Sequence, residues 1–64
     1  MNTYFFSAEI TDLDTNEVYD YSFTVKSEPD KAFWDAKYNT KRWIKATLPN
    51  LEHYDIVILN LNRL

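Results

Sequence analysis

Apolar and polar positions alternate along two stretches near the N-terminus of this chain. From Thr3 to Thr11 and again from Val18 to Lys26, apolar or aromatic residues occupy every second position. A period of two is typical of a strand with one buried face. The segment between the two stretches is polar and rich in turn formers. The pattern therefore predicts an antiparallel hairpin, with Asn16 as the left-handed turn residue because the chain contains no glycine.

A helical period follows the hairpin. Ser27 is expected to cap the N-terminus of the helix, with Pro29 in its first turn. Pro49 disfavours helix at Leu48, so the helix is expected to end near there. Steps of three and four between the less polar residues predict one stripe that faces the sheet. The residues of this stripe are Phe33, Ala36, Thr40, Trp43, Ile44 and Thr47.

The segment from Tyr54 to Asn62 is the third predicted strand, and it is apolar on both faces. Without repeats or linkers, residues 1–64 form one domain. The order of elements predicts an α+β fold in which one helix packs on one face of a three-stranded sheet. We prefer an all-antiparallel sheet in the order 2-1-3, with a right-handed crossover from the second strand to the third. The alternative order is 1-2-3, with the third strand parallel to the second.

The expected core combines the inward positions of both hairpin strands with the helix stripe. Large rings allow a short chain to build such a core without disulfides. The core residues that the pattern predicts are Tyr4, Phe6, Ala8, Ile10, Tyr21, Phe23, Val25, Phe33, Ala36, Ile44 and one apolar set from the third strand.

Composition narrows the class of protein. The chain has no cysteine, which excludes disulfides and thiolate metal sites and fits a reducing compartment. Its first residues do not form a charged-then-apolar leader, and its longest apolar run, Ile56 to Leu59, is too short to cross a bilayer. We therefore expect a soluble, cytoplasmic protein that does not enter membranes.

Charge is divided along the chain. The formal net charge is −3. Residues 1–25 contain five acids and no base, whereas residues 37–45 contain four cations and no acid. The domain is thus acidic in total and has a basic helix.

The sequence DLDTNE between the first two strands has the alternating Asp and Asn of a calcium loop. An EF-hand loop that begins at Asp12 requires glycine at its sixth position and glutamate at its twelfth. Those positions hold Glu17 and Phe23. Since Asp and Asn also favour turns by bonding to their own backbone, we interpret the segment as a hairpin tip and expect no metal site.

Catalytic motifs are also missing. His53 is the one histidine, and the lack of glycine excludes Gly-rich phosphate loops and nucleophile elbows. We therefore expect neither catalytic residues nor a cofactor, and we do not expect an enzyme.

The side of the helix away from the stripe is more informative. Trp34 and Tyr38 lie one turn apart there, and Lys41, Arg42 and Lys45 continue the same side. Trp, Tyr and Arg are enriched in binding hot spots, which favours a partner-binding surface for another protein. The same residue types suit nucleic acid, which is the second choice because the acidic segment would repel phosphates. A third interpretation packs Trp34 on the rim of the core and leaves the cations in solvent.

The β-β-α-β order with the sequence FTVKSEPDKAFWDAKYNTKRWI resembles short proteins encoded by phages and mobile elements. In outline it is similar to small phage inhibitors of host RNA polymerase. This resemblance implies a regulator or inhibitor that occupies a surface of a host protein and performs no chemistry. It concerns architecture, and no functional residue is transferred from it.

One helix can cover only one face of the sheet, so the other face is expected to support a homodimer, through the third strand edge to edge or face to face. Unpaired backbone groups along an outer strand favour such pairing. The rival is a monomer in which Asn60, Asn62 and Arg63 shield the strand. The residues expected on the open face are Phe5 with either Ile56 and Ile58, or Val57, Leu59 and Leu61.

Overall fold

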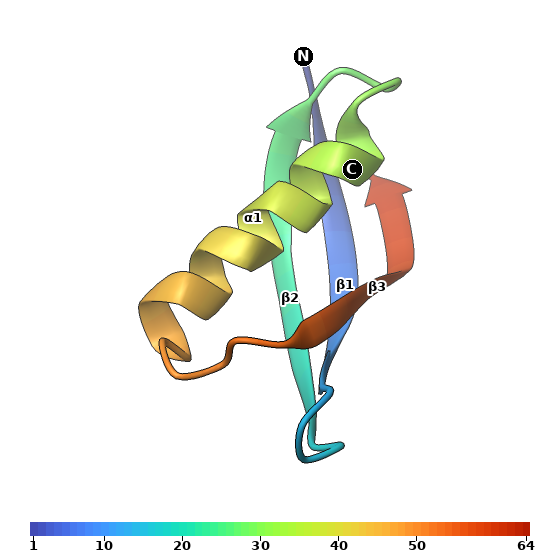
Figure 1. Cartoon of the computed structure of the whole chain (residues 1–64). Helices are drawn as coiled ribbons and strands as arrows, with labels where there is room; N and C mark the ends of the chain where they lie inside the picture. The colour runs from blue at the N-terminus through green and yellow to red at the C-terminus, as the bar shows by residue number, and fades with distance from the viewer.

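The computed structural model describes all residues from 1 to 64. Three strands and one helix follow one another in the predicted order, and Figure 1 shows the helix lying across one face of the sheet. The sheet is fully antiparallel with the order β2-β1-β3. This confirms the predicted α+β class and the preferred strand order, and it excludes the order 1-2-3. The elements are β1 (Asn2–Asp12), β2 (Val18–Ser27), α1 (Ala32–Thr47) and β3 (Tyr54–Arg63).

The segment DLDTNE forms the turn of the β1–β2 hairpin. Asn16 has a φ angle of 63°, the left-handed conformation predicted for it. The backbone N–H of Asp14 donates to Oδ1 of Asp12 at 2.8 Å, and the N–H of Asn16 donates to the carbonyl oxygen of Asp12 at 2.7 Å. The Asp12 carboxylate and the left-handed backbone of Asn16 therefore organise the turn through local bonds.

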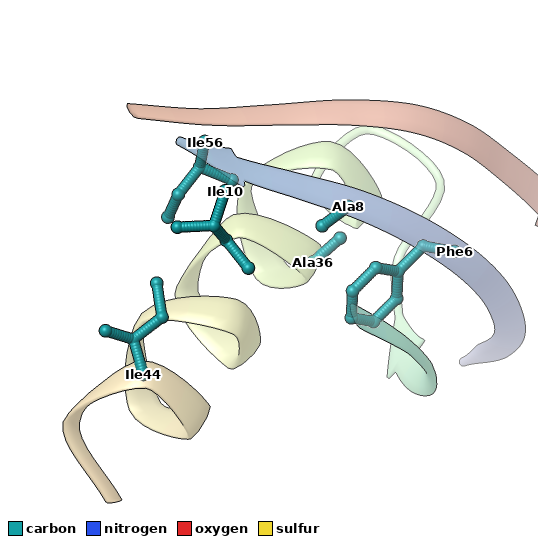
Figure 2. Close-up of a cluster of buried hydrophobic side chains, with 6 residues drawn as sticks. All are labelled: Phe6, Ala8, Ile10, Ala36, Ile44 and Ile56. Atoms are coloured by element: carbon teal, nitrogen blue, oxygen red, sulfur yellow. The ribbon is translucent and has the colours of Figure 1, made fainter. Parts of the chain in front are cut away.

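The core lies between β1, which is the central strand, and α1. Ala8 on β1 and Ala36 on α1 point toward each other in Figure 2, and their small side chains allow the helix to approach the sheet closely. Phe6 and Ile10 are fully buried on either side of this contact. Burial of each of these larger side chains contributes about 1.5–3 kcal/mol. The six core residues are Phe6, Ala8, Ile10, Ala36, Ile44 and Ile56.

The start of the helix differs from the prediction. Its N-cap is Lys31, because Glu28 to Lys31 form a separate turn closed by a bond from Lys31 N–H to the Glu28 carbonyl oxygen at 3.0 Å. Pro29 lies in that turn. Ser27 is not the cap: it is buried at the end of β2, and its hydroxyl donates to the carboxylate of Asp35 in the first turn of α1. It thereby fixes the strand to the helix.

The buried row of the helix consists of Ala32, Ala36, Thr40 and Ile44, four residues at steps of four. Phe33, predicted for the core, lies beside this row and is 43% exposed. Because the small residues of the row bring the helix close to the sheet, little room is left for a phenylalanine at its flank.

Phe23 was predicted for the core and is also exposed, at 55%. Its position on the helix-covered side is as expected, since it lies opposite Phe6 and stacks on Tyr21 with ring centroids 6.2 Å apart. The helix crosses the sheet diagonally, however, and leaves part of β2 uncovered (Figure 1). It covers the other part, where Tyr21 stacks on Trp43 at 4.5 Å and donates to Oδ1 of Asn39 at 2.7 Å. Burial raises the pKa of the Tyr21 hydroxyl.

A bulge in β3 changes which side chains share a face. Ser7 pairs with Asn60 and Ala8 pairs with Ile58, so Leu59 is an extra residue without a partner on β1. An extra residue reverses the alternation beyond it. Leu61 therefore packs against the core on the side of Ile58, and its predicted place beside Leu59 on the opposite face is wrong.

The single helix is neither long enough nor apolar enough to cross a membrane.

We predict that Ser27→Ala lowers the free energy of unfolding by about 1.5–3 kcal/mol, because it removes a buried hydrogen bond to a charged group. Ser22→Ala is the matched control on the same strand: Ser22 is exposed and bonds to Ser7 at 3.3 Å. Its cost should stay within about 0.5 kcal/mol. Urea denaturation of both variants measures the difference, and equal losses would contradict the structural role of Ser27.

Candidate binding surface on the helix

The five predicted partner-binding residues lie together on the side of α1 that faces away from the sheet. At 3.6 residues per turn they fall within an arc of about 100° opposite the buried row. All five are exposed. We call this set the helix outer face: Trp34, Tyr38, Lys41, Arg42 and Lys45.

Two large rings dominate the helix outer face. Trp34 is 65% exposed and Tyr38 is 64% exposed. These values contradict the interpretation that Trp34 packs on the rim of the core. The rim position belongs instead to Trp43, which is partly buried and stacked on Tyr21. The helix therefore uses one tryptophan for folding and leaves the other in solvent.

Phe33 and Lys37 extend the surface toward the N-terminus of the helix. The Phe33 and Trp34 rings meet edge to face, with centroids 5.3 Å apart and planes at 85°. The Nζ atom of Lys37 lies 5.7 Å from the centroids of both rings. Such cation–π contacts hold the rings in place at a modest gain in free energy. A shallow pocket of ≈ 380 Å³ adjoins them, lined by Trp34, Asp35, Lys37, Tyr38 and Lys41.

Neither of these two additional residues was predicted for the partner-binding surface. Phe33 was assigned to the core because it fits the helical period. Lys37 follows Trp34 by three positions and Phe33 by four, which is the spacing at which side chains on a helix meet. That spacing was the available signal.

The cations of the surface are not neutralised within the chain. The one ion pair joins Nδ1 of His53 to Oδ2 of Asp14 at 3.2 Å, and neither residue belongs to α1. Asp35, the acid nearest to the surface on the helix, is engaged by Ser27. The helix outer face therefore presents net positive charge next to exposed rings.

The residues predicted for self-association are divided between the two sides of the sheet. Ile56 is buried, and Ile58 and Leu61 are partly buried against the core. Neither predicted set is therefore open as a whole. The members that remain exposed are Phe5 at 37%, Val57 at 48% and Leu59 at 54%.

His53, the one histidine, and Tyr19 both have structural partners. His53 binds Asp14, and its carbonyl oxygen accepts from the N–H of Leu13 at 2.9 Å, so it ties the loop before β3 to the hairpin tip. Tyr19 donates to the Glu17 carboxylate at 2.9 Å, and this bond raises the pKa of Tyr19. No three side chains of the metal-binding types are grouped so that they could hold an ion.

A second hollow, of ≈ 250 Å³, lies between the hairpin and the loop after α1. It is lined by Asp12, Tyr19, Thr47, Leu48, Pro49, Asn50 and Leu51.

Comparisons with protein-family models, with curated proteins and with solved structures found no match.

The two tryptophans give a direct test of this geometry. We predict that acrylamide quenches Trp34 strongly and Trp43 weakly, because Trp34 is exposed and Trp43 is stacked on Tyr21. Trp34→Phe should shift the emission maximum to shorter wavelength and reduce the quenching constant. Trp43→Phe should do the opposite. Equal quenching of the two single-tryptophan variants would contradict the arrangement.

Proposed function

We propose that this chain is a non-enzymatic protein-binding module that acts through the helix outer face. The observation that carries the proposal is the pair of rings, Trp34 and Tyr38, both about two-thirds exposed and one turn apart. Rings of this kind surrounded by cations are typical of the residues that dominate binding energy at protein interfaces.

The spacing of these residues along α1 favours binding of the helix in a groove of the partner. Trp34, Tyr38, Lys41 and Lys45 follow at steps of four, three and four, which aligns them along one ridge of α1. A ridge of this kind inserts into a groove of a partner, with the two rings as anchors. The lysines further along the ridge would contact the rim of that groove.

Charge defines the partner further. The unpaired cations favour an acidic protein surface, and such complementarity accelerates association and excludes basic partners. The resemblance to short phage proteins supports a regulator or inhibitor that occupies a surface of a host protein. We place this function in the cytoplasm, in keeping with a chain that contains no cysteine.

Affinity capture from the host lysate tests the proposal. The double variant Trp34→Ala/Tyr38→Ala should fold as the wild type does. It should fail to capture at least one host protein that the wild type captures. Leu13→Ala is the control, because Leu13 is 58% exposed at the hairpin tip and lies outside the surface. A photo-crosslinking residue at position 38 should label the same protein, whereas one at Thr24 on the open face of the sheet should not. Retention of the same proteins by the double variant would refute the proposal.

Nucleic acid is the second candidate, because exposed rings beside Lys37 and Lys41 also suit stacking on bases and contacts with phosphates. This candidate predicts that the chain binds mixed single- and double-stranded oligonucleotides in a salt-sensitive manner. The double variant Lys41→Glu/Arg42→Glu should abolish that binding. Arg63→Glu reverses a charge on β3 and serves as the control. Our first proposal expects no such binding at moderate salt, and the titration therefore separates the two classes.

A further inference from the structure

We propose that two copies of this chain dimerise through the outer edge of β2, so that their sheets join into one antiparallel sheet of six strands. β2 is an edge strand, bonded on one side to β1 and free on the other. Its ten residues pair with β1 in an unbroken register and include no proline. A long, regular edge offers a row of unpaired N–H and C=O groups to a second strand.

The sequence of β2 is complementary to itself around Phe23. An antiparallel pair of β2 strands with its two-fold axis at Phe23 places Asp20 opposite Lys26 of the partner subunit, and Lys26 opposite Asp20 of the partner subunit. Ser22 then lies opposite Thr24 of the partner subunit. A shift by two residues removes both charge pairs, because Asp20 would face threonine or Glu28. The charges therefore select one register.

The monomer leaves both of these charged residues without a partner. Asp20 lies directly opposite Glu9 on β1, and Lys26 lies opposite Thr3, with no ion pair at either position. Like charges at directly opposed positions destabilise a sheet, whereas opposite charges stabilise it. A lysine from a second copy at this edge would supply the cation that Glu9 and Asp20 lack.

The helix-covered side of β2 is suited to the same pairing. Phe23 is 55% exposed, and in this register its ring meets the ring of Phe23 of the partner subunit across the axis. Tyr21, which is partly buried, lies opposite Val25 of the partner subunit. Aromatic and β-branched pairs of this kind are the stabilising units of antiparallel sheets.

The position of the helix is compatible with a second sheet at this edge. Figure 1 shows α1 crossing the sheet diagonally, so that its C-terminal end reaches past β2. In the C-terminal half of β2, Ser27 is buried and bonded to Asp35 of the helix, whereas Phe23 is exposed. The two-fold axis is perpendicular to the sheet and reverses the strand direction. Since α1 packs on one face of the sheet, its overhanging end does not pair with the backbone groups along the outer edge of β2.

The opposite edge of the sheet is less suitable. β3 contains the bulge at Leu59, which interrupts the regular spacing of backbone groups and twists an edge away from pairing. Val57 and Leu59 are exposed on β3, and the acidic residue Glu9 of β1 lies opposite Val57. Face-to-face packing of two such sheets would bring further acids together. Of the two edges, the β2 edge is the one whose charges complement those of a second copy.

Sedimentation equilibrium at tens to hundreds of micromolar tests the dimer by charge reversal. Lys26→Glu places acid opposite acid twice and should weaken dimerisation by at least about tenfold. The swapped variant Asp20→Lys/Lys26→Glu restores opposite charges and should recover most of the affinity. Lys41→Glu on the helix outer face should leave the dimer unchanged. A monomeric wild type, or a swapped variant no better than Lys26→Glu, would overturn the proposal.

Cysteine crosslinking tests the register independently. The chain contains no cysteine, so Phe23→Cys introduces a single thiol at the proposed axis. Because the two thiols face each other there, mild oxidation should give a covalent dimer even from a weakly associated population. Leu59→Cys is the matched control, since Leu59 is equally exposed on the other edge. Preferential crosslinking at position 59, or none at position 23, would reject the β2 edge.

Discussion

One sixteen-residue helix must cover a sheet of three strands, and the arrangement of the whole molecule depends on that constraint. The helix can seal the central strand, where Phe6, Ala8 and Ile10 are buried, but not the full width of the sheet. The paired alanines Ala8 and Ala36 set its close approach (Figure 2). Its diagonal course then decides the rest: Trp43 in its C-terminal half stacks on Tyr21 of β2, and Phe23 remains exposed on the same strand.

Much of this fold follows from patterns that one sequence carries. Two strands of period two around a glycine-free turn indicated a hairpin, with Asn16 as its left-handed residue, and the hairpin restricted the third strand to an outer position. The period also identified the inward face correctly. The period does not indicate where along that face the helix lies, and Phe23 and Phe33 were therefore wrongly predicted to be in the core. Nor could it reveal the bulge at Leu59, because the bulge depends on pairing with β1.

The candidate surface was predictable for a related reason. Removing the residues of the apolar stripe from α1 leaves the side that faces solvent, and Trp34 and Tyr38 are conspicuous there. The sequence could not decide between a ring at the rim of the core and a ring in solvent, since both fit the same period. Small residues decide it: with Ala32 and Ala36 in the buried row, the helix lies low on the sheet, and Trp34 projects from the opposite side. None of the five residues of the helix outer face belongs to the core cluster, and we therefore expect the fold to tolerate their substitution.

The two proposed surfaces lie on different elements and are compatible with one another. In a dimer formed by β2 the axis is perpendicular to the sheet, so both helices lie on the same side and their outer faces point in the same direction. A single helix outer face would offer a partner two ring anchors and a few exposed cations, for which we expect only modest affinity. Two of them on one rigid sheet convert the second contact into an intramolecular one, at an effective concentration that can strengthen binding by about 10²–10⁴-fold without new contacts. A partner with two equivalent sites would gain this advantage, and a monomeric partner would not. Dimerisation at the edge of β2 would then determine which partners the helix outer face binds, although β2 itself would contact none of them.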